Sequence, residues 1–138
     1  QMLATFALMD RDSRKVHSVD PEMVATYLSE FSKKIIRGPK CTDLDNPTSK
    51  DYHVRFYDLD MNGHVNNSKY LDWIFEVMGA DFLMGHIPQK INLKYVKEVR
   101  PGGMISSSYE LIGSQSRHQV TSQGVVNAQA LIQWTTKE

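Results

Sequence analysis

Residues 57–67 read Tyr-Asp-Leu-Asp-Met-Asn-Gly-His-Val-Asn-Asn, and Tyr70 follows three residues later at the start of an apolar-periodic segment. Within eleven residues the stretch holds two carboxylates, one imidazole, three carboxamides and one glycine. A surface turn does not need this much chemical functionality. We therefore interpret the stretch as an active-site loop. Its position in the sequence also indicates where the neighbouring strand ends and the next helix begins.

The loop separates a predicted strand from a predicted helix. Residues 52–57 alternate between apolar and polar side chains, as in a half-buried strand. After the loop, Asn67 or Ser68 can cap a helix whose apolar residues continue at helical spacing until Gly85. This helix is apolar around most of its circumference, so we expect other elements to cover it. Four further strands are predicted, at residues 90–99, 104–112, 118–123 and 125–135. Together the pattern indicates an α+β domain in which an antiparallel sheet wraps around a helix.

The residues before the loop predict a less regular region. Residues 3–9 have the pattern of a strand, and residues 10–15 that of a polar turn. Asp20 and Pro21 mark the start of a helix with an apolar stripe that reaches Phe31. Residues 32–50 lose this periodicity and collect basic, proline and small polar residues, so we expect an interdomain linker there.

Composition excludes several classes of function. The 138 residues carry a formal net charge of zero, with 41% hydrophobic and 23% charged residues. Nucleic-acid binding is not indicated, because it normally requires a basic patch or stripe. No apolar run approaches the roughly 20 residues that span a bilayer, and a cytoplasmic location is the expectation. The single cysteine, Cys41, cannot form an internal disulfide and lies far from any nucleophile signature.

Two metal-binding interpretations of the loop fail. Asp58-x-Asp60-x-Asn62-Gly63 matches the first half of a calcium-binding loop, but Lys69 occupies the position that should supply a bidentate glutamate. His64 with an aspartate could begin a zinc site, yet no second histidine or cysteine lies at ligand spacing. The sequence therefore predicts no metal and no other cofactor.

Hydrolysis by a carboxylate fits the loop better. A carboxylate beside a carboxamide and an imidazole can attack or activate water. The free backbone N–H groups at the start of the following helix can stabilise a developing oxyanion. Gly63 permits a close approach to substrate or a positive φ.

The same residues carry a resemblance to a known family. Asp58 to Tyr70, Asp-Leu-Asp-Met-Asn-Gly-His-Val-Asn-Asn-x-x-Tyr, resembles the signature of the acyl-acyl carrier protein thioesterases, in the hotdog-fold thioesterase superfamily. The likeness continues through Trp73 and into residues 93–99, Leu-Lys-Tyr-Val-Lys-Glu-Val. Family members have two hotdog domains in tandem. The resemblance thus implies a C-terminal hotdog domain at residues 51–138, an interdomain helix and linker at 16–50, and the last strand of an N-terminal hotdog domain at 1–15.

The resemblance also implies roles for individual residues. Asp60, Asn62, His64 and Glu98 correspond to the family's catalytic positions. We interpret Asp60 as nucleophile or base and Glu98 as the group that orients or deprotonates water. Asn62 would position Asp60 or the thioester carbonyl, and His64 would donate a hydrogen bond. The remaining candidates are substrate contacts: Gly63, Asn66, Asn67, Tyr70 and Trp73.

Several of these residues also have plainer structural interpretations. Asp58 favours a bracing role in the loop. Asn66 and Asn67 can cap the helix, and Tyr70 and Trp73 can belong to the core. Plant members carry a cysteine directly after the matched glutamate, where this chain has Val99, so a cysteine mechanism at that position cannot operate here.

By this resemblance the reaction would be release of a free fatty acid from acyl carrier protein, in fatty acid biosynthesis. Basic residues are candidates for docking that acidic carrier: Lys33, Lys34, Arg37, Lys40, Lys94, Lys97 and Arg100. Two alternatives stay open, an acyl-CoA thioesterase of the same superfamily and a non-catalytic acyl-binding module. Because hotdog domains pair, we also expect a homodimer or pairing between hotdog domains.

Overall fold

A computed structural model describes residues 4, 8–10, 12–13, 15–25 and 38–138. The chain divides into two compact units, residues 1–38 and 39–138. The first holds a short antiparallel hairpin, β1 (Leu8–Met9) with β2 (Val16–His17), and helix α1 (Pro21–Ala25). Asp20 accepts a hydrogen bond from the Glu22 N–H at 3.0 Å, as a helix-capping residue does. The rest of the predicted strand at 3–9 and of the helix to Phe31 lies outside the described residues.

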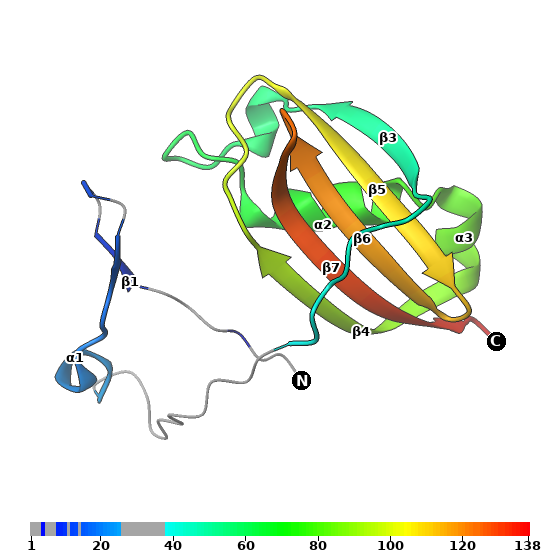
Figure 1. Cartoon of the computed structure of the whole chain (residues 1–138), viewed down its shortest axis with the longest axis horizontal. Helices are drawn as coiled ribbons and strands as arrows, with labels where there is room; N and C mark the ends of the chain where they lie inside the picture. The colour runs from blue at the N-terminus through cyan, green and yellow to red at the C-terminus, as the bar shows by residue number, and fades with distance from the viewer. Residues whose placement is uncertain (1–3, 5–7, 11, 14, 26–37) are drawn as a thin grey trace. The chain divides into compact units, whose positions relative to one another are not determined.

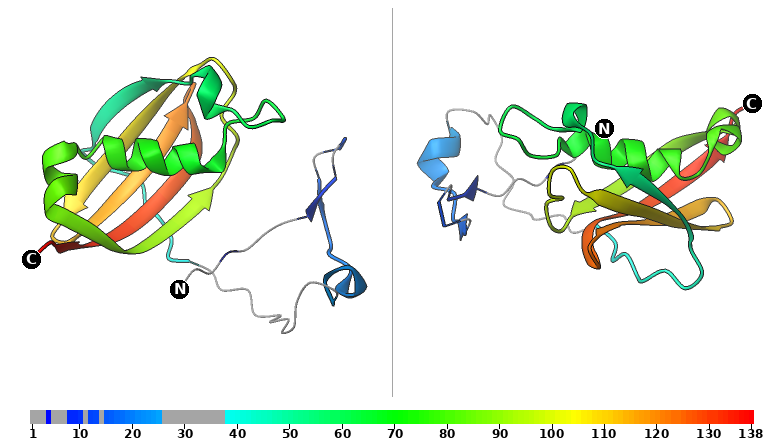
Figure 2. Two further views of the ribbon diagram at one scale, coloured as in Figure 1. Left: turned by 180° about the vertical axis from the view of Figure 1, so that it is seen from behind. Right: turned by 90° about the horizontal axis from the view of Figure 1, so that it is seen from above.

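The second unit is a five-stranded antiparallel sheet with a helix across one face (Figures 1 and 2). This confirms the predicted α+β hotdog architecture. The strands lie in the order β3-β5-β6-β7-β4. Their bounds are β3 (Thr48–His53), β4 (His86–Tyr95), β5 (Met104–Ile112), β6 (Gln115–Ser122) and β7 (Val125–Thr136). Strands β5, β6 and β7 form a meander, whereas β4 pairs with β7 at the far edge rather than with β5.

The predicted bounds of three strands were wrong. The strand at 52–57 is β3, which begins at Thr48, ends at His53 and is followed by the 3-10 helix η1 (Phe56–Asp58). The strand at 90–99 begins earlier, at His86, and ends at Tyr95. The strand at 118–123 begins at Gln115.

The single helix predicted up to Gly85 is also wrong, because the structure has two. Helix α2 (Asn67–Glu76) is followed by α3 (Ala80–Gly85), and Gly79 lies between them with φ +85° and ψ 155°. Asn66, not Asn67 or Ser68, is the N-cap of α2, since its side chain accepts the Ser68 N–H at 3.0 Å. Helix α2 buries Tyr70, Trp73 and Ile74 against the sheet, as a central helix should.

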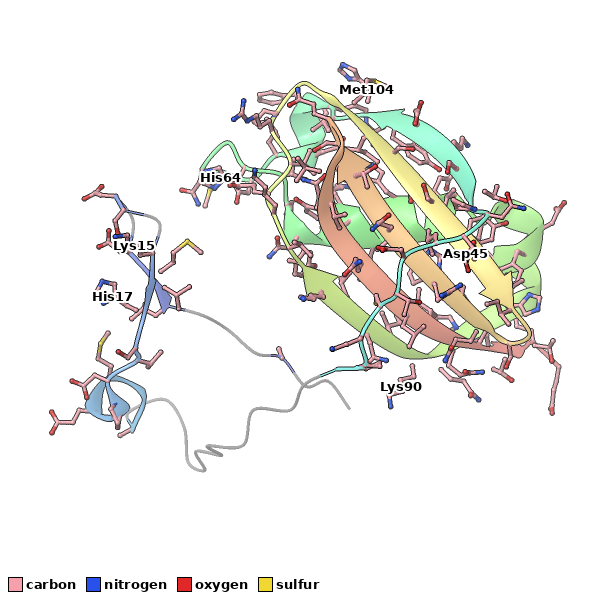
Figure 3. All side chains as sticks on the ribbon, viewed as in Figure 1. Lys15, His17, Asp45, His64, Lys90 and Met104 are labelled. Carbon is pink, nitrogen blue, oxygen red and sulfur yellow. The ribbon has the colours of Figure 1, made fainter. Side chains whose placement is uncertain are left out.

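Residues 39–47 run across the opposite face of the sheet from α2 (Figures 1 and 3). Arg117 of β6 contacts this segment through Thr42, and it also pairs with Glu110 of β5 at 2.6 Å. Glu110 in turn accepts a hydrogen bond from the Asn46 N–H. The predicted linker therefore contains a part that is fixed to the second unit before β3 begins. Whether residues 1–15 come from a preceding hotdog domain stays a prediction.

Candidate active site

The loop between η1 and α2 is held by Asp60. Its Oδ1 accepts the N–H groups of Asn62 at 2.8 Å and His64 at 3.0 Å. Its own N–H donates to the His64 carbonyl at 2.7 Å. Gly63 has φ +75°, a left-handed conformation that disfavours a side chain at this position. One carboxylate oxygen of Asp60 is thus committed to the loop, and Oδ2 is the atom that could act on a substrate.

His64 and Glu98 meet although 33 residues separate them in the chain. His64 Nδ1 lies 3.3 Å from Glu98 Oε1, and the two side chains are 45% and 38% exposed. Together with the bond from His64 N–H to Asp60, this contact links three of the four predicted catalytic residues. The fourth, Asn62, is exposed on the same loop, which projects away from the strands (Figure 3).

Glu98 lies on a segment that two buried residues hold in place. The Val99 N–H donates to the Tyr70 hydroxyl at 3.1 Å, and Tyr70 is only 2% exposed. Asn127 of β7 donates from Nδ2 to the carbonyls of Lys97 at 3.1 Å and Glu98 at 3.4 Å. Tyr70, predicted as a substrate contact, is therefore a core residue that positions Glu98 through the backbone. Burial raises its hydroxyl pKa.

Asn127 was missed from the sequence, although a signal existed. It is 1% exposed and is a carboxamide within the apolar alternation of β7. Such a residue needs hydrogen-bond partners when it is buried. The partners it finds are backbone carbonyls next to the candidate base.

The other predicted substrate contacts have structural partners. Asn66 caps α2, and the Asn67 carbonyl accepts a hydrogen bond from the Tyr95 hydroxyl at 2.9 Å. Trp73 is 5% exposed, its ring lies edge-on to Tyr70 at 5.6 Å, and it also lines a groove beside α2. Gly63 is exposed in the loop. The binding roles of these residues stay predictions.

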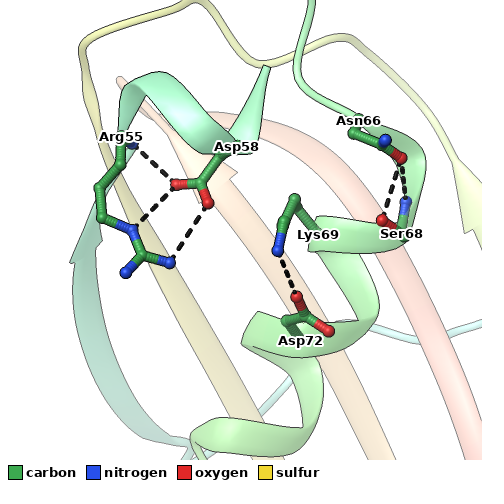
Figure 4. A network of polar contacts seen from close by, with 6 residues as sticks. All are labelled: Arg55, Asp58, Asn66, Ser68, Lys69 and Asp72. Atoms are coloured by element: carbon green, nitrogen blue, oxygen red, sulfur yellow. Dashed lines mark hydrogen bonds and ion pairs between the residues drawn. The ribbon is translucent and has the colours of Figure 1, made fainter. Parts of the chain in front are cut away.

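Asp58 braces the base of the loop. Its side chain accepts the Arg55 N–H at 2.8 Å and the Arg55 guanidinium at 3.3 Å, and it is 1% exposed (Figure 4). Burial alone would raise its pKa, but the hydrogen bonds from Arg55 outweigh burial and lower it. The Asp58 carboxylate therefore has a structural partner, as the bracing interpretation predicts.

Two of the cavities among the described residues lie beside α2, and neither of these is lined by Asp60, Asn62, His64 or Glu98. The larger, of about 700 Å³, lies between β3 and α2 and is rimmed by Asp51, Asp58, Asp72 and Glu76 as well as Arg55 and Lys69. Within the described residues, no three His, Cys, Asp or Glu side chains are grouped to hold a metal. The described helices include none that is long and apolar enough to cross a bilayer.

Comparison with known proteins points to one family. Residues 41–136 match the family model of the acyl-ACP thioesterase C-terminal domain. The chain is 34% identical over 117 residues to a dodecanoyl-[acyl-carrier-protein] hydrolase of Umbellularia californica, covering 79% of this chain and 31% of that protein. It is 26% identical over 114 residues to oleoyl-acyl carrier protein thioesterase 1 of Arabidopsis thaliana, covering 74% and 32%.

A solved structure agrees. A protein designated an oleoyl thioesterase from Lactobacillus plantarum superposes with a TM-score of 0.81 at 32% identity, covering 94% of this chain and 54% of that one. The chain therefore spans about a third of the plant relatives and about half of the bacterial one. The match to the family model covers more than half of the present sequence, and it includes the loop, Glu98 and all five strands of the sheet. The chain belongs to the acyl-ACP thioesterase family, and residues 41–136 correspond to the C-terminal domain of that family.

Proposed function

We propose that this domain carries the hydrolytic site of a thioesterase that releases a fatty acid from acyl carrier protein. The observation that carries the proposal is the 3.3 Å contact between Glu98 and His64, which lies on the loop that Asp60 holds. A carboxylate against an imidazole, both partly exposed, is a suitable pair to take a proton from water. The names of the two plant relatives both mention acyl carrier protein, which supports an acyl-carrier-protein thioester as the substrate.

In the proposed reaction each of these residues has its own role. Glu98, with His64 beside it, takes a proton from water, and the resulting hydroxide attacks the thioester carbonyl carbon. The tetrahedral intermediate expels the pantetheine thiolate, which regains a proton, and leaves the carboxylic acid. Asp60 acts chiefly as the residue that positions His64, since its Oδ1 already accepts two backbone N–H groups. Asn62, exposed on the same loop, can donate to the carbonyl oxygen as charge develops there.

Single-turnover hydrolysis of acyl-carrier-protein thioesters, with matched acyl-CoA thioesters, tests the proposal. We expect Glu98→Gln to lower the rate by about 10²–10⁴-fold, the usual contribution of a general base. Asp72→Asn is the matched control, because Asp72 is an exposed carboxylate of α2 that pairs with Lys69. Equal rates for Glu98→Gln and the parent chain would contradict the proposal.

The same experiment separates the alternatives. Faster turnover of the acyl-CoA thioester than of the carrier-protein thioester would favour the acyl-CoA thioesterase. Binding of both thioesters without turnover, unchanged in Glu98→Gln, would favour the acyl-binding module. The candidate carrier-docking residues Lys40, Lys94, Lys97 and Arg100 are exposed, whereas Lys33, Lys34 and Arg37 lie outside the described residues.

We also propose that the β4 edge pairs with a second hotdog sheet, in a homodimer or with another domain. Among the described strands only β7 pairs with β4, which leaves the backbone groups of its other edge available. Ile87, Ile91 and Tyr95 of this strand are 46%, 39% and 45% exposed. An edge with exposed apolar residues favours pairing with another strand.

A further inference from the structure

The smaller cavity lies at the opposite end of α2 from the loop. It has a volume of about 280 Å³. Its lining comes from α2, α3, β4, β7 and the residue after β7: Phe75, Leu83, His86, Ile87, Pro88, Trp134 and Lys137. Five of these seven side chains are apolar, two are basic, and none is acidic. The larger groove differs, since four carboxylates line it.

The apolar wall of this cavity is built from interlocked aromatic rings. Trp134 is 3% exposed, and the rings of Phe75 and Phe82 lie edge-on to it at 5.8 and 5.1 Å between centroids. Its only polar atom, Nε1, donates to Ser116 Oγ at 2.7 Å. The indole therefore satisfies its hydrogen-bond donor inside the core, and its apolar surface can contact a hydrocarbon.

Two basic side chains are held at the cavity. Lys137 Nζ donates to the Leu83 carbonyl at 3.2 Å, which leaves two ammonium N–H groups for another acceptor. The His86 ring stacks on Phe82 at 4.0 Å, and Nδ1 donates to the Phe82 carbonyl at 2.9 Å. This bond places the proton of a neutral His86 on Nδ1, so Nε2 stays available. Lys137 supplies a fixed positive charge beside an apolar wall.

We propose that this cavity binds a medium-length alkyl carboxylate. The chain would lie against Phe75, Ile87 and Trp134, and the carboxylate would accept hydrogen bonds from Lys137. The volume is at the lower end of the range for ligand pockets, roughly 300–1,000 Å³, so a chain such as that of decanoate fits better than a long one. This ligand has the chemistry of the product under the proposed function, but its binding can be measured without turnover.

Titration of the full chain with decanoate, 1-decanol and decyltrimethylammonium tests the site. Calorimetry gives the affinities, and amide chemical shifts locate the ligand. We expect decanoate to bind most tightly and to shift residues 83–88, Trp134 and Lys137. Lys137→Met should weaken decanoate about three- to tenfold, as for loss of one partly exposed charge contact, and leave 1-decanol unchanged.

Matched variants separate a specific effect of Lys137 from a general effect of losing one positive charge. Lys90→Met removes the same charge from an exposed residue of β4 that does not line the cavity, so it should not alter decanoate binding. Ile87→Glu places a carboxylate at the half-exposed apolar wall and should abolish it. The inference is overturned if decanoate does not bind, if Lys90→Met and Lys137→Met have equal effects, or if the shifts map to residues 51–58. None of these outcomes bears on Glu98, so the two proposals fail separately.

Discussion

Asp58 and Asp60 are two residues apart and hold different parts of one loop. Asp60 accepts two backbone N–H groups at the loop tip, whereas Asp58 accepts hydrogen bonds from Arg55 at the base. Because Asp58 is almost fully buried, its neutral amide counterpart would lose charge-assisted hydrogen bonds that water cannot replace. The base of the loop should therefore depend on this charge.

We predict that Asp58→Asn lowers the free energy of unfolding by about 1–3 kcal/mol at pH 7, the usual cost of losing hydrogen bonds to a buried charged group. The folded-state pKa of Asp58 is lowered from 3.8, so its charge contributes stability above that value. This contribution is lost as the pH falls through the folded-state pKa, and the variant should then approach the parent chain. Urea unfolding at pH 7 and below pH 4 measures the difference. Asp51→Asn, at an exposed carboxylate, is the control.

His118 is the end of a buried polar chain beneath α2. Trp134 Nε1 donates to Ser116 Oγ, and Ser116 Oγ lies 2.7 Å from His118 Nε2. The serine hydroxyl has one donor and two acceptor lone pairs, so Ser116 can accept from the indole and still hydrogen-bond Nε2 as donor or as acceptor. Among the described residues Nδ1 has no hydrogen-bond partner. Burial lowers the pKa of His118 from 6.5 to about 4.

We predict an acid-sensitive fold as a result. The unfolded state binds a proton at His118 below pH 6.5, whereas the folded state does so only near pH 4, so stability declines as pH falls between these values. The loss should reach roughly 3 kcal/mol, at about 1.4 kcal/mol per pKa unit. Urea unfolding between pH 7 and pH 4 measures it. The His118→Gln variant should have a lower free energy of unfolding at pH 7, and this free energy should change less between pH 7 and pH 4 than in the parent chain. The His53→Gln variant should keep the pH dependence of the parent chain. If the free energy of unfolding of His118→Gln depended on pH as steeply as that of the parent chain, His118 would not be the source of the acid sensitivity.

At the scale of elements, Gly79 decides that one apolar segment becomes two helices. With φ +85° and ψ 155° it occupies a backbone region that is nearly restricted to glycine. A Cβ at this position would meet no atom within 4 Å, so any cost of substitution comes from the backbone alone.

We predict that Gly79→Ala destabilises the fold by about 1–3 kcal/mol, the cost of a sparsely populated backbone conformation. Gly85→Ala is the matched control, because Gly85 also has open space around its Cβ position and no positive φ. Thermal unfolding of both variants measures the difference. Equal melting temperatures would show that the chain accommodates a side chain at residue 79 by rearranging.

A comparison of the predicted and observed elements shows which parts of the fold the sequence predicts. Apolar spacing located the helix and most strands, because one face of each is buried. It placed the start of β4 too late, because β4 begins at His86 and continues through Pro88, which an edge strand tolerates, with a bulge between Pro88 and Lys90. Apolar spacing also predicted one continuous helix across Gly79, because spacing alone does not reveal a positive φ.

The candidate site was predicted from a different signal. The resemblance of residues 58–70 and 93–99 to a known family implied Asp60, Asn62, His64 and Glu98, and the structure brings Asp60, His64 and Glu98 into contact. The carboxamide in the apolar alternation of β7 could have marked Asn127 as a buried polar residue, but its partners and the positioning role of Tyr70 depend on tertiary contacts with residues 97–99. Long-range hydrogen bonds to a backbone leave little trace in the sequence.

At the scale of the whole molecule, we predict self-association through β4 when no other sheet covers it. Light scattering after size exclusion should give a mass above that of the monomer. Ile91→Lys should shift the chain toward the monomer by placing a charge on the exposed edge. Ile112→Lys, on β5 and 63% exposed, should have no such effect. A monomer at all concentrations would contradict the proposed pairing in this chain.

The strand order has a consequence for how the molecule assembles. Strands β5, β6 and β7 are consecutive and joined by tight turns. The entropy cost of closing the loops of their hairpins is therefore small. The outer strands pair at long range, Thr48 of β3 with Tyr109 and His86 of β4 with Thr136. Long loops are slower and entropically costlier to close. The meander should therefore fold early, and the loop at residues 59–66, which follows an outer strand, should be among the last parts to form and the first to open.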